Sequence, residues 1–71
     1  MDIYTFLAPV LSDHMLIDRV YQLIGCPATV DNLYDYFMKH DGTVNQIHVA
    51  KLQIEDPEDR KKFISALHSI K

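Results

Sequence analysis

The chain has 71 residues, of which 48% are hydrophobic and 24% are charged, and its net charge is −3. This length allows one small domain, residues 1–71, and the hydrophobic content argues against disorder. Because Cys26 is the single cysteine, an internal disulfide and a disulfide-stapled secreted scaffold are excluded. The negative charge is also unusual for a nucleic-acid-binding protein, which normally presents a basic face.

The N-terminal segment shows neither the pattern of an export signal nor that of a membrane anchor. Asp2 stands where a signal peptide carries positive charge. The longest apolar run, residues 6–11, is far shorter than the roughly 20 residues that span a bilayer. We therefore expect a cytoplasmic protein that makes no membrane contact.

Turn-forming residues divide the chain into five short segments, and the first two favour helices. Residues 2–11 are apolar at nearly every position, and Pro9 should end a helix near Ala8, with a buried strand as the alternative. Ser12 is a favourable N-cap for a second helix, whose apolar side chains recur with helical spacing over residues 16–24. Gly25 is suited to ending that helix in a left-handed conformation.

The third segment predicts a helix from the N-cap Thr29 to about His40, with Gly42 as its C-terminal cap. The fifth segment begins equally clearly, because Asp56 is an N-cap and Pro57 occupies the first helical position. These signals make the third and fifth segments helices.

The fourth segment, residues 43–54, fits either a helix or a strand. Thr43 and Gln46 match the capping-box pattern of a helix, whereas residues 47–54 also show the partial alternation of a strand. We therefore predict an all-α fold, a compact bundle of four to five short helices. An α+β fold with a strand at 47–54 is the alternative.

Residues 30–71 resemble the three-helix core of helix-turn-helix and winged-helix domains. Two expected helices are followed by a turn at residues 53–56 and by the helix that begins at Pro57. Gln53 replaces the usual turn glycine, and no wing follows the last helix. The resemblance implies that the exposed face of the last helix enters the DNA major groove. The candidate nucleic-acid contacts that it implies are Arg60, Lys61 and Lys62.

The charges around this basic run weaken a DNA-binding interpretation. Acidic residues crowd the first turn of the last helix and would repel phosphates; they are Glu55, Asp56, Glu58 and Asp59. Adjacent helical residues are also rotated by about 100°, so three basic neighbours lie on different faces. We expect these three side chains to form an ordinary solvated surface.

No pattern in the sequence indicates catalysis, a metal site or a cofactor. The four histidines, at positions 14, 40, 48 and 68, never fall three or four residues apart on one helix, and Cys26 lies in a turn. The two glycines are too few for a phosphate-binding loop. We expect no catalytic residue, no metal and no cofactor.

Aromatic and methionine side chains outside the expected apolar stripes are the best indication of function. Tyr and Met are enriched at protein interfaces, and the candidate interaction surface consists of Tyr4, Tyr21, Tyr36 and Met38. We predict a small cytoplasmic interaction or regulatory module that binds a protein partner or self-associates as a homo-oligomer. The alternative is a helix-turn-helix transcriptional regulator that binds DNA through residues 44–71.

Overall fold

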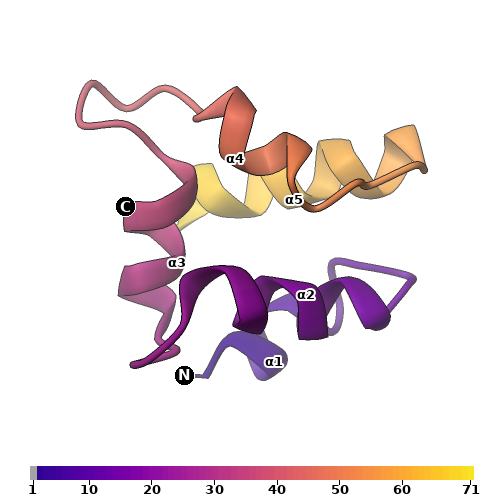
Figure 1. Ribbon diagram of the computed structural model, residues 1–71. Helices are drawn as coiled ribbons and strands as arrows, with labels where there is room; N and C mark the ends of the chain where they lie inside the picture. The colour runs from indigo at the N-terminus through magenta and orange to yellow at the C-terminus, as the bar shows by residue number, and fades with distance from the viewer. Residues whose placement is uncertain (1) are drawn as a thin grey trace.

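Five helices make up the regular structure of residues 2–71, the part of the chain that the computed structural model describes (Figure 1). They are α1 (Ile3–Leu7), α2 (Met15–Ile24), α3 (Val30–Phe37), α4 (Gln46–Ala50) and α5 (Pro57–Ser69). The predicted all-α bundle is confirmed. The alternative strand at 47–54 is wrong, because α4 occupies residues 46–50 and a turn without strand pairing follows it.

The helices form two layers that are joined at one end. Figure 1 shows α1 and α2 in the lower layer, α4 and α5 in the upper layer, and α3 standing across one end of both. The core lies between the layers and receives fully buried side chains from every helix. Near its centre, the rings of Phe37 and Phe63 meet edge to face with centroids 5.2 Å apart. The core therefore ties α3 to α5.

Three of the predicted helix ends are formed as expected. The Thr29 hydroxyl accepts a hydrogen bond from the Asn32 N–H (3.1 Å), and Asp56 accepts one from the Glu58 N–H (2.9 Å). Gly25 ends α2 with a φ of 70°, which is the left-handed region that glycine tolerates best. Local capping chemistry thus determines the start of α3, the start of α5 and the end of α2.

The start of α2 differs from the prediction. The residue before its first turn is His14, which makes no side-chain cap, while Asp13 accepts a hydrogen bond from the Met15 N–H (3.0 Å). Ser12, the expected N-cap, instead donates its hydroxyl to Asp59 of α5 at 2.6 Å. A bond to a charged carboxylate is stronger than a bond from a neutral backbone N–H, so the contact with α5 prevails over a local cap.

The segment between α3 and α4 was also predicted wrongly. α3 ends at Phe37 rather than near His40, because Met38 turns to an extended conformation and forms a β-bridge with Val44. Gly42, with a φ of 86°, therefore lies in the turn of this loop and does not cap α3. The Thr43 hydroxyl donates to Asp41, which leaves Asn45 as the N-cap of α4.

Candidate functional site

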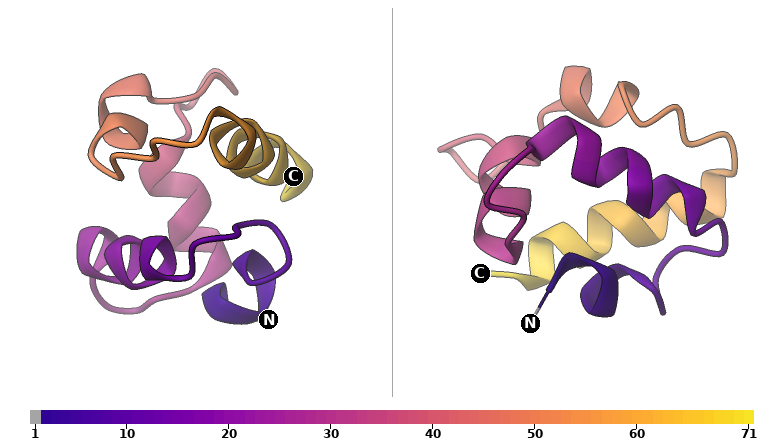
Figure 2. Two further views of the ribbon diagram at one scale, coloured as in Figure 1. Left: turned by 90° about the vertical axis from the view of Figure 1, so that its right-hand side faces the viewer. Right: turned by 60° about the horizontal axis from the view of Figure 1, so that its bottom comes forward.

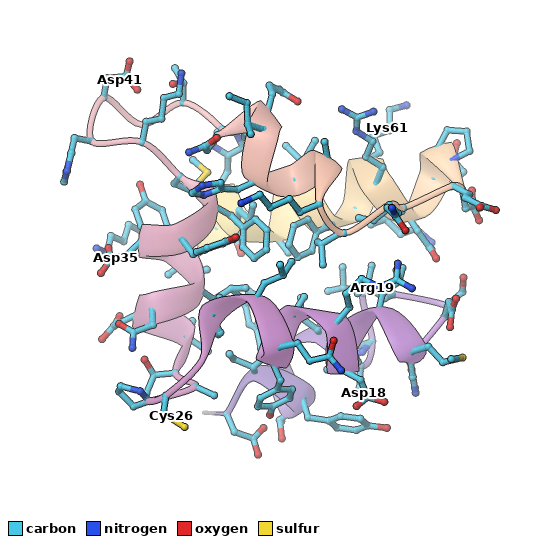
Figure 3. All side chains as sticks on the ribbon, in the orientation of Figure 1. Asp18, Arg19, Cys26, Asp35, Asp41 and Lys61 are labelled. Carbon is cyan, nitrogen blue, oxygen red and sulfur yellow. The ribbon has the colours of Figure 1, made fainter. Side chains whose placement is uncertain are left out.

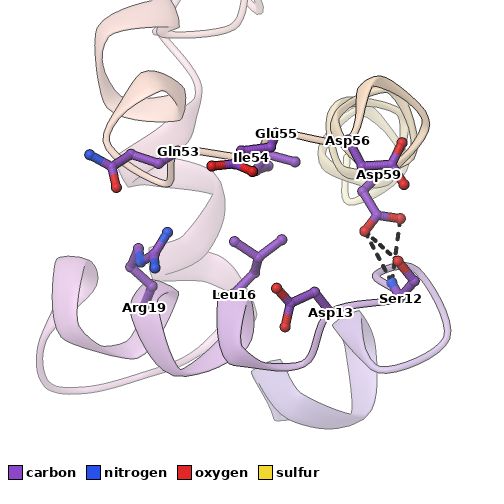
Figure 4. Close-up of a pocket in the computed structure, with 9 residues that line it drawn as sticks. All are labelled: Ser12, Asp13, Leu16, Arg19, Gln53, Ile54, Glu55, Asp56 and Asp59. Atoms are coloured by element: carbon purple, nitrogen blue, oxygen red, sulfur yellow. Dashed lines mark hydrogen bonds between the residues drawn. The ribbon is translucent and has the colours of Figure 1, made fainter.

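A pocket of about 370 Å³ lies between the start of α2 and the turn that leads into α5 (Figure 4). Its lining residues are Ser12, Asp13, Leu16, Arg19, Gln53, Ile54, Glu55, Asp56 and Asp59. Asp59 is 4% exposed and accepts both the hydroxyl and the N–H of Ser12. On the opposite side of the pocket, the Arg19 guanidinium donates to the Leu52 carbonyl between the two layers.

These hydrogen bonds connect the lower layer to the upper layer on both sides of the pocket. The Ser12 hydroxyl, helped by backbone N–H groups, holds the pKa of Asp59 below its ordinary value although burial opposes this. Within residues 2–71 no buried side-chain nitrogen or oxygen lacks a partner, and no three acidic, histidine or cysteine side chains are arranged to hold a metal. The pocket's buried polar groups are consequently used to stabilise the fold.

Two of the predicted interaction residues, Tyr4 and Tyr21, meet between α1 and α2. The Tyr21 hydroxyl accepts the Tyr4 backbone N–H (3.2 Å), and the Tyr4 hydroxyl lies 3.3 Å from Nδ1 of His14. Since Nε2 of His14 lies 3.1 Å from the Ala8 carbonyl, Nε2–H donates and Nδ1 accepts from Tyr4. The Tyr4 ring also meets the His14 ring edge on, with centroids 5.7 Å apart. His14 therefore contacts both the hydroxyl and the ring of Tyr4, and Tyr21 contacts its backbone.

Met15 follows His14 directly and extends the exposed area around Tyr4. We call Tyr4, His14, Met15, Asp18 and Tyr21 the α1–α2 surface. Met15 is 72% exposed and Tyr4 is 46% exposed, which is unusual for such large apolar side chains. Sequence analysis missed Met15, although its helical position opposite Ile17 and Val20 was a usable signal. Asp18 lies on the outer side of α2 (Figure 3).

The other two predicted interaction residues do not join this surface. Tyr36 is half-buried beside α4, where its ring stacks on His48 at 4.2 Å and its carbonyl accepts the His48 Nδ1–H at 2.6 Å. Met38 is only 6% exposed and belongs to the core. The assignment of Met38 to an exposed surface is therefore wrong, because the chain leaves the helix at that residue and directs its side chain inward.

The three basic residues of α5 point in different directions, as helical geometry predicts. Arg60 donates to the Gln46 side chain of α4 (3.2 Å), whereas Lys62 lies on the opposite flank beside Pro9 and Val10. Lys61 points outward from the upper layer (Figure 3). The run Arg60, Lys61 and Lys62 therefore forms no single basic patch.

The turn between α4 and α5 has the backbone shape that a glycine would favour. Gln53 has a φ of 54°, and no other residue except glycine in residues 2–71 has a positive φ. This left-handed conformation is costly for a side chain with a Cβ atom. The turn is thus bent at the position where helix-turn-helix domains usually carry glycine.

Comparison of the chain with known protein families, curated proteins and solved structures finds no match. No helix in residues 2–71 is both long enough and apolar enough to cross a membrane. The longest, α5, has 13 residues.

Proposed function

We propose that this protein is a small cytoplasmic regulatory module that binds a protein partner and also associates with itself. The observation that carries the proposal is the exposure of Met15 and Tyr4 on the α1–α2 surface. When a partner covers large apolar side chains that are exposed to water, the free energy of the complex is lowered. Their neighbours Asp18 and His14 supply the polar rim that protein interfaces commonly have.

The hydrogen bonds around Tyr4 support this proposal. A side chain that is already held in its binding geometry loses little conformational entropy when a partner docks. The Tyr4 side chain is held by His14, the Tyr21 hydroxyl is held by the Tyr4 backbone, and α1 and α2 are packed on the core. The α1–α2 surface is therefore preorganised for binding.

Replacing Met15 with glutamate is expected to reduce partner binding at least tenfold, because a charge on this surface must be desolvated in the complex. The measurement is the amount of each protein that the tagged chain captures from an extract of its source cells. Ile47→Glu is the matched control, since Ile47 is 74% exposed on α4, outside the α1–α2 surface. A partner that both variants capture equally well contradicts the proposed surface.

A second candidate function is DNA binding through residues 44–71, and the left-handed turn at Gln53 favours it. The acidic first turn of α5 and the divergence of its basic side chains count against it. If this function is correct, the protein shifts the fluorescence anisotropy of a labelled duplex at low salt. The double substitution Lys61→Glu and Lys62→Glu should then abolish the shift. Absence of any shift at low salt excludes this candidate.

A further inference from the structure

A shallow groove runs along α5 on the side that faces α1. It consists of two adjoining hollows of about 400 and 550 Å³, which share Phe6 and Ser69. Figure 2 shows α1 beside α5 in both views. We call this feature the α1–α5 groove. It lies apart from the α1–α2 surface, because no residue that defines that surface lines either hollow.

The groove is suited to covering by an apolar surface. Half-buried Phe6, Val10 and Ile70 supply apolar walls. On the α5 side the groove is lined by the small residues Ala66 and Ser69. The Ser69 hydroxyl already donates to the Ala66 carbonyl (2.6 Å), so this hydroxyl keeps its hydrogen bond when a partner covers Ser69. Small residues of this kind let a second helix approach closely.

The two ends of the groove carry opposite charges. Lys62 lines the hollow that contains Val10, and Asp31 lines the hollow that contains Ile70. Residues 62 and 70 are about 12 Å apart along α5, at 1.5 Å per helical residue. Both charged side chains are exposed. A surface with one positive and one negative end matches an identical surface that is turned end for end.

We propose that a second copy of this chain covers the α1–α5 groove, with the two α5 helices antiparallel about a two-fold axis. Lys62 then faces the partner's Asp31 at both ends of the interface, which is the repeated contact that a two-fold interface requires. A typical stable interface buries about 800 Å² on each partner. That is less than a fifth of the 4536 Å² that the chain exposes alone. This proposal rests on the self-association part of the proposed function.

The first test places a bulky charge in the middle of the groove. Sedimentation equilibrium over a range of protein concentrations should give a mass that rises from 8.2 kDa to twice that value. Ala66→Arg should raise the dimer dissociation constant at least tenfold, while the matched control Ala50→Arg, at an exposed position of α4, should leave it unchanged. A wild-type protein that remains at 8.2 kDa at millimolar concentration overturns the proposal.

The second test uses charge reversal and does not depend on groove volume. Lys62→Glu and Asp31→Lys each place like charges at both ends of the symmetric dimer, so each variant alone should be monomeric. An equimolar mixture of the two should dimerise again, because both ends then pair opposite charges. Circular dichroism of each variant checks that the helices remain folded. A mixture that stays monomeric, or single variants that dimerise like wild type, overturns the antiparallel arrangement.

The variant Met15→Glu separates this inference from the proposed function. It should lose the protein partner and keep the dimer, since Met15 lies outside the α1–α5 groove. If Met15→Glu abolishes the dimer, the groove proposal is wrong and the α1–α2 surface is itself the site of self-association. If the partner is lost and the groove variants dimerise normally, only the groove proposal fails.

Discussion

Replacing Phe63 with alanine is expected to lower the free energy of unfolding by about 3 to 5 kcal/mol. Phe63 has no exposed surface, and its ring packs edge to face against Phe37. A chain of this length has a total stability of only about 4 to 11 kcal/mol. The cavity left by the ring should therefore remove much of that stability. Urea denaturation followed by far-ultraviolet circular dichroism measures the loss.

His68→Ala is the control for this prediction. His68 is exposed on the same helix, and truncation of a surface side chain usually changes stability by no more than about 0.5 kcal/mol. Equal urea midpoints for the two variants would contradict the docking of α5 on α3. That docking matters for function, because α5 supplies one wall of the α1–α5 groove and also carries the three divergent basic residues.

Sequence signals that act within one turn of a helix predicted the fold well. Thr29 and Asp56 accept hydrogen bonds from backbone groups two or three residues ahead, and Gly25 adopts the conformation that its position requires. In each case the residue and its partner are near neighbours in the chain. The order of the helices, and the assignment of residues 46–50 to a helix, depend on interactions of this local kind.

Sequence signals predicted the wrong N-cap where the side chain bonds to another partner. Ser12 is a good N-cap by type, but Asp59 lies 47 residues away in sequence and takes its hydroxyl. Thr43 likewise bonds to Asp41 and leaves the cap of α4 to Asn45. An aspartate near the start of a helix also looks like a charge that favours the helix dipole. Only its place four residues before Phe63, on the buried face of α5, distinguishes Asp59 from its exposed neighbours Asp56 and Glu58.

The candidate surfaces were predictable only in part. Tyr4 and Tyr21 were identified as off-stripe aromatics, but their hydrogen bond joins two helices whose packing cannot be read from periodicity. The α1–α5 groove could not be predicted, because α1, α3 and α5 each supply part of its wall. Its charged ends, Asp31 and Lys62, are ordinary exposed residues until the fold places them at opposite ends of one groove.

The contact between Ser12 and Asp59 should make the protein sensitive to acid. The pKa of Asp59 is lowered in the folded state, chiefly by the Ser12 hydroxyl, so the unfolded chain binds a proton more readily than the folded one. The stabilising contribution is therefore complete above about pH 4, near the ordinary aspartate pKa. It is lost as the pH falls further, through the pKa of folded Asp59. Asp59→Asn should reduce stability by about 2 kcal/mol at pH 7, typical of a hydrogen bond to a charged group.

A double-mutant cycle isolates this contact from the other carboxylates. Asp2 and Asp41 also have lowered pKa values, because Thr5 and Thr43 respectively donate to them, so the wild-type acid transition reports all three groups. The coupling between Ser12→Ala and Asp59→Asn reports the interaction of the Ser12 hydroxyl with the Asp59 charge and excludes Asp2 and Asp41. We expect a coupling of about 1 to 2 kcal/mol at pH 7 and a smaller one in acid, measured by urea denaturation at each pH. Additive effects at pH 7 would mean that Ser12 and Asp59 stabilise the fold independently, and that the two layers are held together by the apolar core and the hydrogen bond from Arg19 to the Leu52 carbonyl.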